Sequence, residues 1–192
     1  MKKKRLIVGI SGASAPIFGI RALELLRDVP EVETHFVCTK AATVTIQLET
    51  DYSMDQVRDF ADVSYKTGDI AAPIASGSFK TAGMLVAPCS VSTMSSIAVS
   101  ITKDLLTRAA DVTLKERRPL VLMVRESPLH LSHLRRLVEL AEMGVIIAPP
   151  TCSFYHGPKT VLDLIDHTVG RALDVFGFEV PWLNRWEGGA SE

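Results

Sequence analysis

The fold is decided by the stretch Leu6-Ile7-Val8-Gly9-Ile10-Ser11-Gly12-Ala13-Ser14-Ala15-Pro16. It begins with an apolar run that does not alternate, which is typical of a strand covered on both faces of a parallel sheet. The small residues that follow allow a tight turn, and the segment Pro16–Arg27 has the apolar spacing of a helix. The stretch therefore predicts a strand, a turn and a helix, which is how a βαβ unit begins.

The same alternation continues along the chain. Further apolar runs of strand length are His35–Cys38, Met84–Ala87, Leu120–Val124 and Val145–Ala148. Helical spacing is found over Ala41–Glu49, Ser53–Phe60, Lys103–Arg118 (with Thr102 expected as its N-cap), His130–Met143 and Thr160–Phe176. Capping boxes are predicted for Ser53 with Gln56 and for Thr160 with Asp163. This pattern predicts an α/β fold, a doubly wound parallel sheet with helices on both faces. No linker or repeat divides the chain, so we expect a single domain over residues 1–192.

Composition excludes several classes of protein. The 192 residues are 47% hydrophobic, 22% charged and 6% aromatic, which excludes a disordered, collagen-like or coiled-coil chain. With 21 Lys and Arg against 22 Asp and Glu, the chain has no global attraction for nucleic acid, and no such partner is expected. No apolar run approaches the roughly 18 residues of a membrane-spanning helix, so no membrane insertion is expected. The basic start Lys2–Arg5 precedes an apolar run shorter than the roughly 7–15 residues of a signal peptide.

The cysteines indicate the compartment. Cys38, Cys89 and Cys152 are widely separated and form no C-x-x-C motif, which favours reduced thiols, no metal site and the cytoplasm. Cys89 has no His or acid beside it in the sequence, so we expect buried packing rather than a nucleophile. His130 and His133 could share a metal on one helix face, but the leucines around them favour an ordinary amphipathic helix.

Ligands of such folds bind at the carboxyl ends of the strands, so the residues that follow each strand are candidates. Gly12–Ser14 could cradle a phosphate with backbone N–H groups, or form only a tight turn in which Ser14 caps the helix. Thr39 and Ser90–Thr93 carry hydroxyls that could bind a ligand or cap the helices that follow them. Ser76–Ser78 forms another small, polar loop. Arg125, directly after a strand, could fork onto a phosphate.

Other basic residues lie on predicted helices. Arg108 and Lys115 are two turns apart on one face, although i, i+4 pairs with Asp104 and Asp111 could make this a solvated face. Arg171 belongs to a polar stripe that could equally face water; its other members are Asp163, His167 and Asp174.

Several long blocks of the sequence resemble the UbiX-type flavin prenyltransferases, which are related to the Pad-type subunits of aromatic acid decarboxylase systems. The blocks occur in family order over nearly the whole chain: residues 9–14, 48–51, 76–79, 88–90, 108–112, 114–122, 125–126, 154–156 and 185–186. The resemblance implies a flavodoxin-like Rossmann subunit in a dodecamer, with active sites between subunits. It further implies metal-independent transfer of a dimethylallyl group from dimethylallyl monophosphate to N5 and C6 of reduced FMN. The product, prenylated FMN, would serve a UbiD-type decarboxylase in ubiquinone synthesis or aromatic acid decarboxylation.

Matched residue by residue, the resemblance implies a complete set of site residues. The FMN-binding residues are Gly12, Ala13, Ser14, Thr39, Ser90, Val91, Ser92, Thr93 and Arg125. The prenyl phosphate would contact Arg108, Lys115, Glu126, Tyr155 and Arg171, with Trp186 near the allyl group. Catalytic roles fall on Ser14, Glu49, Lys115, Glu126, Tyr155 and Arg171, and Glu49 would help to remove the N5 proton. Ala15-Pro16 departs from the usual Gly-Ala of the family, and Thr39 stands where Ser is commoner.

Two other functions fit the same fold. An FMN-dependent cysteine-type decarboxylase would need a catalytic His after the first helices, and none of the five His lies there. A non-catalytic flavodoxin-like FMN carrier would not need Arg108, Lys115 and Arg171 around a second phosphate. The segment Val180–Trp186 contains two Trp and little helical or strand pattern, which predicts an interface in a homo-oligomer.

Overall fold

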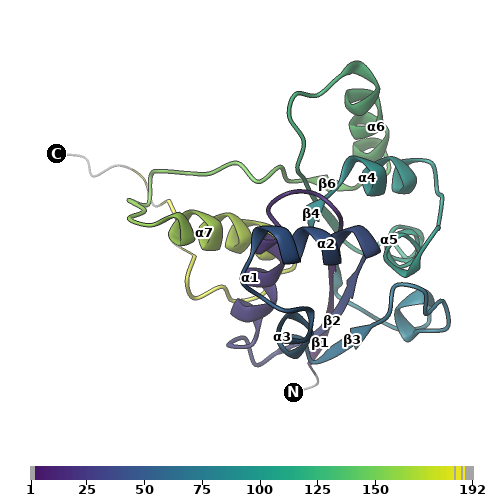
Figure 1. The fold of residues 1–192 in the computed structure, drawn as a ribbon, viewed down its shortest axis with the longest axis horizontal. Helices are drawn as coiled ribbons and strands as arrows, with labels where there is room; N and C mark the ends of the chain where they lie inside the picture. Colours follow the sequence, from purple (N-terminus) through teal and green to yellow (C-terminus); the bar gives the residue numbers. More distant parts are fainter. Residues whose placement is uncertain (1–2, 184, 187, 189–192) are drawn as a thin grey trace.

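The computed structural model describes residues 3–183, 185, 186 and 188. In this part of the chain, a six-stranded parallel sheet has the strand order β3-β2-β1-β4-β5-β6 (Figure 1). The strands are β1 (Lys4–Ile10), β2 (Val32–Cys38), β3 (Val63–Tyr65), β4 (Gly83–Cys89), β5 (Leu120–Val124) and β6 (Ile146–Ile147). The order reverses between β1 and β4, and this switch point is where ligands bind in doubly wound sheets. The predicted fold class is confirmed.

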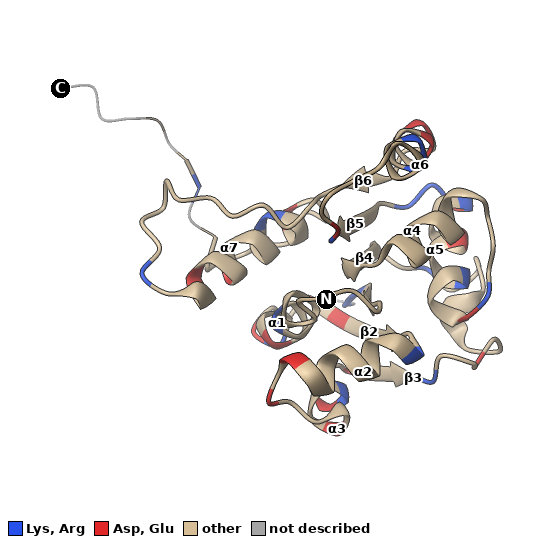
Figure 2. Cartoon of the chain, turned by 45° about the horizontal axis from the view of Figure 1, so that its top comes forward, with Lys and Arg blue, Asp and Glu red and all other residues tan. Residues whose placement is uncertain are grey.

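Helices cover both faces of the sheet. They are α1 (Ile17–Leu26), α2 (Lys40–Glu49), α3 (Met54–Asp59), α4 (Val91–Ala98), α5 (Leu105–Lys115), α6 (Leu131–Glu142) and α7 (Val161–Asp174), with a 3₁₀ turn at Pro73–Ala75. Residues of α1, α2, α3 and α7 share one buried core, and residues of α4, α5 and α6 share another. In β1, Leu6 and Val8 belong to the first core and Ile7 to the second, so successive side chains enter opposite layers. This explains why the central strands are apolar without alternation, and Figure 2 shows no charged position on β4.

Most helix ends follow from local signals. The capping boxes of Ser53 with Gln56 and of Thr160 with Asp163 are present as predicted. Gly144 follows α6 with φ +88°, a conformation that glycine adopts at little cost. No helix among the described residues is both long and apolar enough to cross a bilayer.

The expectation for the Lys103–Arg118 helix is wrong at both ends. The helix begins after Asp104, whose carboxylate accepts the Thr107 N–H at 2.8 Å, so Asp104 rather than Thr102 is the N-cap. It ends at Lys115, and Arg118 instead donates to the carbonyls of Gly77 and Phe79. The expected i, i+4 ion pairs are replaced: Arg108 pairs with Asp111, and Lys115 with Glu116. Strand β3 was not expected from the sequence, and α4 was expected only as a helix that Ser90–Thr93 could cap.

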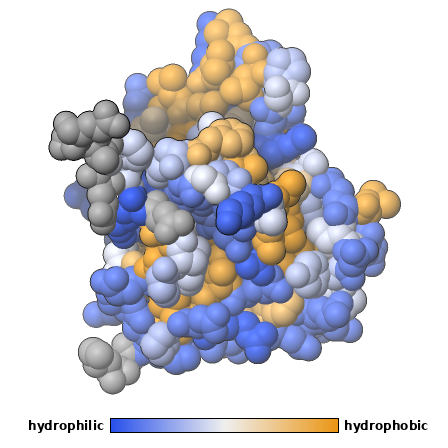
Figure 3. All heavy atoms as spheres, turned by 90° about the vertical axis from the view of Figure 1, so that its left-hand side faces the viewer, coloured by the Kyte–Doolittle hydropathy of each residue, from blue (hydrophilic) through white to orange (hydrophobic). Residues whose placement is uncertain are grey.

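One helix leaves an apolar face uncovered. The C-terminal half of α6 packs against the rest of the molecule: Leu140 is its one fully buried residue, and Leu137 is partly buried against the same core. Leu131, Leu134 and Val138 are exposed on the outer side, and Figure 3 shows apolar atoms gathered at the top of the molecule, where α6 lies in Figure 1.

Candidate functional site

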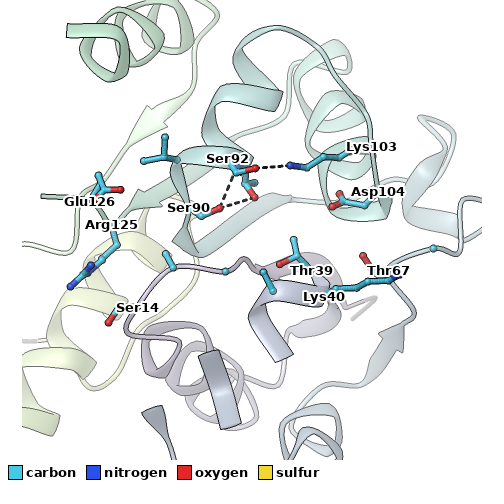
Figure 4. Close-up of a pocket in the computed structure, with 16 residues that line it drawn as sticks. Ser14, Thr39, Lys40, Thr67, Ser90, Ser92, Lys103, Asp104, Arg125 and Glu126 are labelled. Carbon is cyan, nitrogen blue, oxygen red and sulfur yellow. Dashed lines mark hydrogen bonds between the residues drawn. The ribbon is translucent and has the colours of Figure 1, made fainter. Parts of the chain in front are cut away.

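The loops at the carboxyl ends of five strands, β1 to β5, surround a cleft of about 780 Å³ (Figure 4). This volume is within the usual range for a small-molecule or cofactor site. The lining residues are Gly12, Ala13, Ser14, Thr39, Lys40, Ala41, Thr67, Gly68, Ser90, Val91, Ser92, Thr93, Lys103, Asp104, Arg125 and Glu126. All nine residues expected to bind FMN are among them, although they come from four separate segments of the sequence.

Two helix N-termini open into the cleft. Thr39 caps α2, where its hydroxyl accepts the Ala42 N–H at 3.1 Å. Ser90 caps α4, where its hydroxyl accepts the Thr93 N–H at 3.2 Å and donates to Thr93 Oγ1 at 3.1 Å. The expected helix capping is present, and the same residues also line the cleft, so capping and a position in the cleft are compatible. Two helix dipoles directed at one space favour an anion there.

A buried hydroxyl joins the loops after β1 and β4. Ser11 Oγ donates to the Pro88 carbonyl at 3.0 Å and accepts the Ser90 N–H at 2.7 Å. Ser11 is fully buried. These bonds fix the loop of Gly12–Ser14 against the start of α4, which holds two sides of the cleft at a constant distance.

Gly12 is required by close packing. A Cβ added at this position would lie 2.3 Å from the Cβ of Ala41, at the start of α2. Real Cβ atoms do not approach so closely, so any side chain here would push α2 away from the loop. Gly12 therefore sets the width of the cleft between β1 and α2.

Glu49 fixes the far end of the first loop. Ser14 Oγ donates to Glu49 Oε2 at 2.9 Å, and the Ala15 N–H donates to the same oxygen at 2.7 Å. Ser14 is therefore not the cap of α1; the N-cap position is Pro16, which makes no side-chain capping bond. Ala15 has φ +67°, a left-handed conformation that is unfavourable for alanine, and the bond from its N–H to Glu49 offsets part of that cost.

Figure 4 shows that the two ends of the cleft differ. Ser14, Arg125 and Glu126 lie at one end, and Lys40, Thr67, Lys103 and Asp104 lie at the other. At this second end, Lys103 Nζ donates to Ser92 Oγ at 2.7 Å. Both ends thus offer a cation, and the hydroxyls and backbone N–H groups lie between them.

Six lining residues were not predicted from the sequence: Lys40, Ala41, Thr67, Gly68, Lys103 and Asp104. Thr67 and Gly68 follow β3, a three-residue strand that is too short to give a recognisable period. Lys40 could have been found, because it directly follows the strand-end residue Thr39. Lys103 and Asp104 were assigned to a helix, whereas they lie in the loop before it.

A second group of expected residues lies around α7. Tyr155 Oη lies 3.1 Å from His167 Nε2, and the ring of Trp186 meets the Tyr155 ring at 76° with centroids 5.8 Å apart. Arg171 lines a hollow of about 280 Å³ together with His167. His167 is only 3% exposed, so the interpretation of this stripe as facing water is wrong for His167.

The remaining expected residues are elsewhere. Arg108 donates to the Ala75 carbonyl at 3.2 Å and to Asp111 at 2.7 Å, and Lys115 pairs with Glu116 beside Gly77. Neither lines the cleft. Within one chain, the residues expected to bind the prenyl phosphate therefore form separate groups on α5, around α7 and in the cleft.

The thiols of Cys38 and Cys89 pack in the interior, whereas Cys152 is exposed. Cys89 is fully buried, and burial raises the pKa of its thiol well above the usual value. Burial likewise raises the pKa of Cys38 to about 11. The expectation that Cys89 packs in the core is confirmed.

The centroids of the His130 and His133 rings lie 3.5 Å apart, and no cluster of three or more potential metal ligands occurs among the described residues.

A family model for flavoproteins matches residues 1–173. Flavin prenyltransferase UbiX of Escherichia coli strain K12 is 56% identical over 187 residues, which cover 96% of this chain and 99% of that protein. This chain belongs to the UbiX flavin prenyltransferase family. The resemblance stated from the sequence blocks is therefore confirmed.

Solved structures of the family share the fold closely. The crystal structure of AnUbiX (PadA1) in complex with FMN and dimethylallyl pyrophosphate has a TM-score of 0.95 and 44% identity, and it covers 98% of this chain and 100% of that one. A dodecameric FMN-dependent UbiX-like decarboxylase from Escherichia coli O157:H7 has a TM-score of 0.93 and 48% identity, over 96% of this chain and 100% of that one.

Proposed function

We propose that this chain transfers a dimethylallyl group from dimethylallyl monophosphate to N5 and C6 of reduced FMN. The observation that carries the proposal is the cleft, where four separate segments bring together all the residues expected to hold FMN. Its two helix N-termini and its hydroxyls suit a phosphate, and its volume suits a flavin. Bound reduced FMN supplies the nucleophilic positions to which the prenyl group is joined.

Glu49 and Ser14 are the proton-handling pair of this proposal. The Glu49 carboxylate accepts the Ser14 hydroxyl at 2.9 Å, and Ser14 itself lines the cleft. A proton released in the cleft can reach the carboxylate through this hydroxyl. Because the Ala15 N–H holds the same oxygen at 2.7 Å, the carboxylate is fixed in the required direction.

The phosphate would be held by the group around α7. As the allylic C–O bond breaks, its electron pair goes to the phosphate, and Arg171 and Tyr155 can neutralise and bind that charge. The Trp186 ring beside Tyr155 offers a π face to the allylic cation. Water has to be excluded, because it would otherwise capture the cation.

We further propose that the site is completed between subunits of a homo-oligomer, specifically a dodecamer. In one chain, Arg108 and Lys115 of α5 contact neither the cleft nor the α7 group, so a second copy would have to bring them to the phosphate. The exposed apolar face of α6 and the exposed Trp186 are surfaces that such contacts would cover.

The product and its setting are also part of the proposal. The protein acts as a single domain over residues 1–192 in the cytoplasm. It requires no metal ion, and it delivers prenylated FMN to a UbiD-type decarboxylase, in ubiquinone synthesis or aromatic acid decarboxylation.

The test is anaerobic incubation of the purified protein with reduced FMN and dimethylallyl monophosphate, followed by mass spectrometry of the flavin. We expect the flavin to gain one five-carbon prenyl unit and inorganic phosphate to be released. Reactions without the prenyl phosphate, or with the pyrophosphate in its place, are the controls. Tight FMN binding with no change in flavin mass would identify an FMN carrier instead.

A further inference from the structure

The Tyr155 hydroxyl is positioned by a residue outside its own segment of the chain. Tyr155 lies in a segment without regular secondary structure between β6 and α7, and its side chain is 48% exposed. Neither its backbone nor its burial therefore fixes the direction of its hydroxyl. Tyr155 Oη lies 3.1 Å from Nε2 of His167, and the two rings meet edge to face, with centroids 5.3 Å apart at 82°. The Tyr155 ring also contacts His156 and Trp186 edge to face, whereas His167 contacts the hydroxyl itself.

His167 is suited to this task because it is itself fixed. Its ring is buried and stacks on His156, with centroids 3.9 Å apart and an interplanar angle of 6°. The preceding residue, Asp166, accepts two hydrogen bonds of 2.8 Å from the guanidinium of Arg21 on α1. Such a forked pair holds α7 against α1, and therefore holds the imidazole in place.

His167 is also close to both side chains to which the proposed function assigns the prenyl phosphate. It precedes Arg171 by one turn of α7, so the two share a helix face. Both line the hollow of about 280 Å³, with Thr151 and Ser153 among the other lining residues. On its other side, His167 contacts Tyr155.

We infer that His167 is a positioning residue, which orients the Tyr155 hydroxyl toward the prenyl phosphate; the inference rests on the proposed function. With its proton on Nε2, the imidazole donates to Tyr155 Oη. The hydroxyl hydrogen of the tyrosine is then directed away from the ring and is available to a phosphate oxygen. His167 does not touch the substrate in this account.

Three variants separate positioning from packing. His167→Leu fills the space without a hydrogen bond, and His167→Asn has an amide that is too short to reach Tyr155. His167→Gln carries an amide that can donate near the position of Nε2. We expect Leu and Asn to lower kcat/KM for dimethylallyl monophosphate roughly 3- to 10-fold, the effect of one hydrogen bond, with the Kd for FMN unchanged. The His167→Gln variant should have a kcat/KM within about twofold of the wild-type value.

A double-mutant cycle tests whether the effect passes through Tyr155. We expect Tyr155→Phe and the double variant Tyr155→Phe/His167→Leu to have the same kcat/KM within about twofold. If the Leu variant fails to fold, the Asn variant takes its place in the cycle. Losses that add in the double variant would overturn the inference, as would wild-type kcat/KM in both the Leu and the Asn variants.

The chain offers a matched control. Tyr65 Oη lies 2.8 Å from Nδ1 of His35, and this second tyrosine–histidine pair lines neither the cleft nor the α7 hollow. Tyr65→Phe should leave kcat/KM unchanged. A wild-type protein that forms no prenylated flavin would overturn both the proposed function and this inference. An active wild type with additive losses would overturn this inference alone.

Discussion

The carboxylate of Glu49, at the end of α2, accepts the hydroxyl of Ser14 at 2.9 Å, across 35 positions of sequence. The same oxygen accepts the Ala15 N–H at 2.7 Å, where the backbone is left-handed. One carboxylate therefore has two effects that can be separated: it shapes the loop after β1, and its charge can accept a proton.

Glu49→Gln should remove the charge while leaving an amide oxygen for the Ala15 N–H. We expect FMN affinity to change little and prenylation to slow roughly 10²- to 10⁴-fold, the usual range for loss of a general base. Single-turnover mass spectrometry of the flavin measures this rate. Glu49→Ala is the comparison, because it should also weaken FMN binding by releasing the loop. A Gln variant with the wild-type rate would remove Glu49 from proton transfer.

Replacing both Ser90 and Thr93 by Ala should weaken FMN binding by about 1–3 kcal/mol, since each neutral hydrogen bond contributes roughly 0.5–1.5 kcal/mol. Titration of flavin fluorescence measures the affinity. Ser53→Ala is a matched control, because Ser53 caps α3 in the same way but does not line the cleft. It should lower stability by about 1 kcal/mol without changing FMN affinity. Equal FMN affinity in the double variant and the wild type would exclude the two hydroxyls from the site.

Arg171→Ala should leave FMN binding intact and slow prenylation roughly 10²- to 10³-fold, by analogy with the loss of one preorganised donor. Arg171→Lys should restore only part of the rate, because an ammonium cannot form a bidentate fork. Arg58→Ala on α3 is the control, since Arg58 pairs with Asp55 as Arg171 pairs with Asp174, in each case an Asp three residues away. Full-rate formation of prenylated flavin by Arg171→Ala would mean that Arg171 only faces solvent on α7 and does not bind the phosphate.

Glu substituted for both Leu131 and Val138 should break the oligomer, because burying two carboxylates on an apolar face is costly. Light scattering should show smaller species, and prenylation should be lost with them if the site is shared between subunits. Ser132→Glu is the control, since Ser132 is exposed on another side of α6. An unchanged mass in the double variant would mean that α6 does not contribute to assembly.

Acid should destabilise the protein through His35. Burial lowers the pKa of His35 below its usual 6.5, despite the bond of its Nε2 to Glu33 at 2.8 Å. Between pH 6.5 and this lowered value, the unfolded chain binds a proton that the folded chain does not, so stability falls as pH falls. The slope from one such group is at most about 1.4 kcal/mol per pH unit.

Urea unfolding at several pH values tests this expectation. His35→Gln should flatten the dependence of stability on pH in that window. An equally steep dependence in the His35 variant would assign the effect to other groups. Glu33 adds to the effect at lower pH, because its hydrogen bond with His35 lowers the pKa of the Glu33 carboxyl.

Local chemistry was enough to predict much of the fold. Apolar runs predicted every strand except β3, and Leu120–Val124 matches β5 residue for residue. The capping boxes at Ser53 and Thr160 were predicted because both partners of each box lie within one turn of helix. The loops after the strands were predicted to converge because parallel strands all end at the same edge of a sheet. These features depend only on neighbouring residues or on the sheet direction.

Tertiary structure decided which side chains contact one another, because those contacts depend on which distant residues pack together. The hydroxyl of Ser14 had a local partner available as a helix cap, yet it bonds Glu49, which only the approach of α2 to the first loop brings near. His167 belongs to a polar stripe, yet contacts with Tyr155 and His156 bury it. Arg108 and Arg171 are both expected at the prenyl phosphate, yet within one chain they belong to separate groups, because α5 and α7 pack on opposite faces of the sheet. Sequence determines which groups are present and at which strand end; packing across the sheet determines which of them meet.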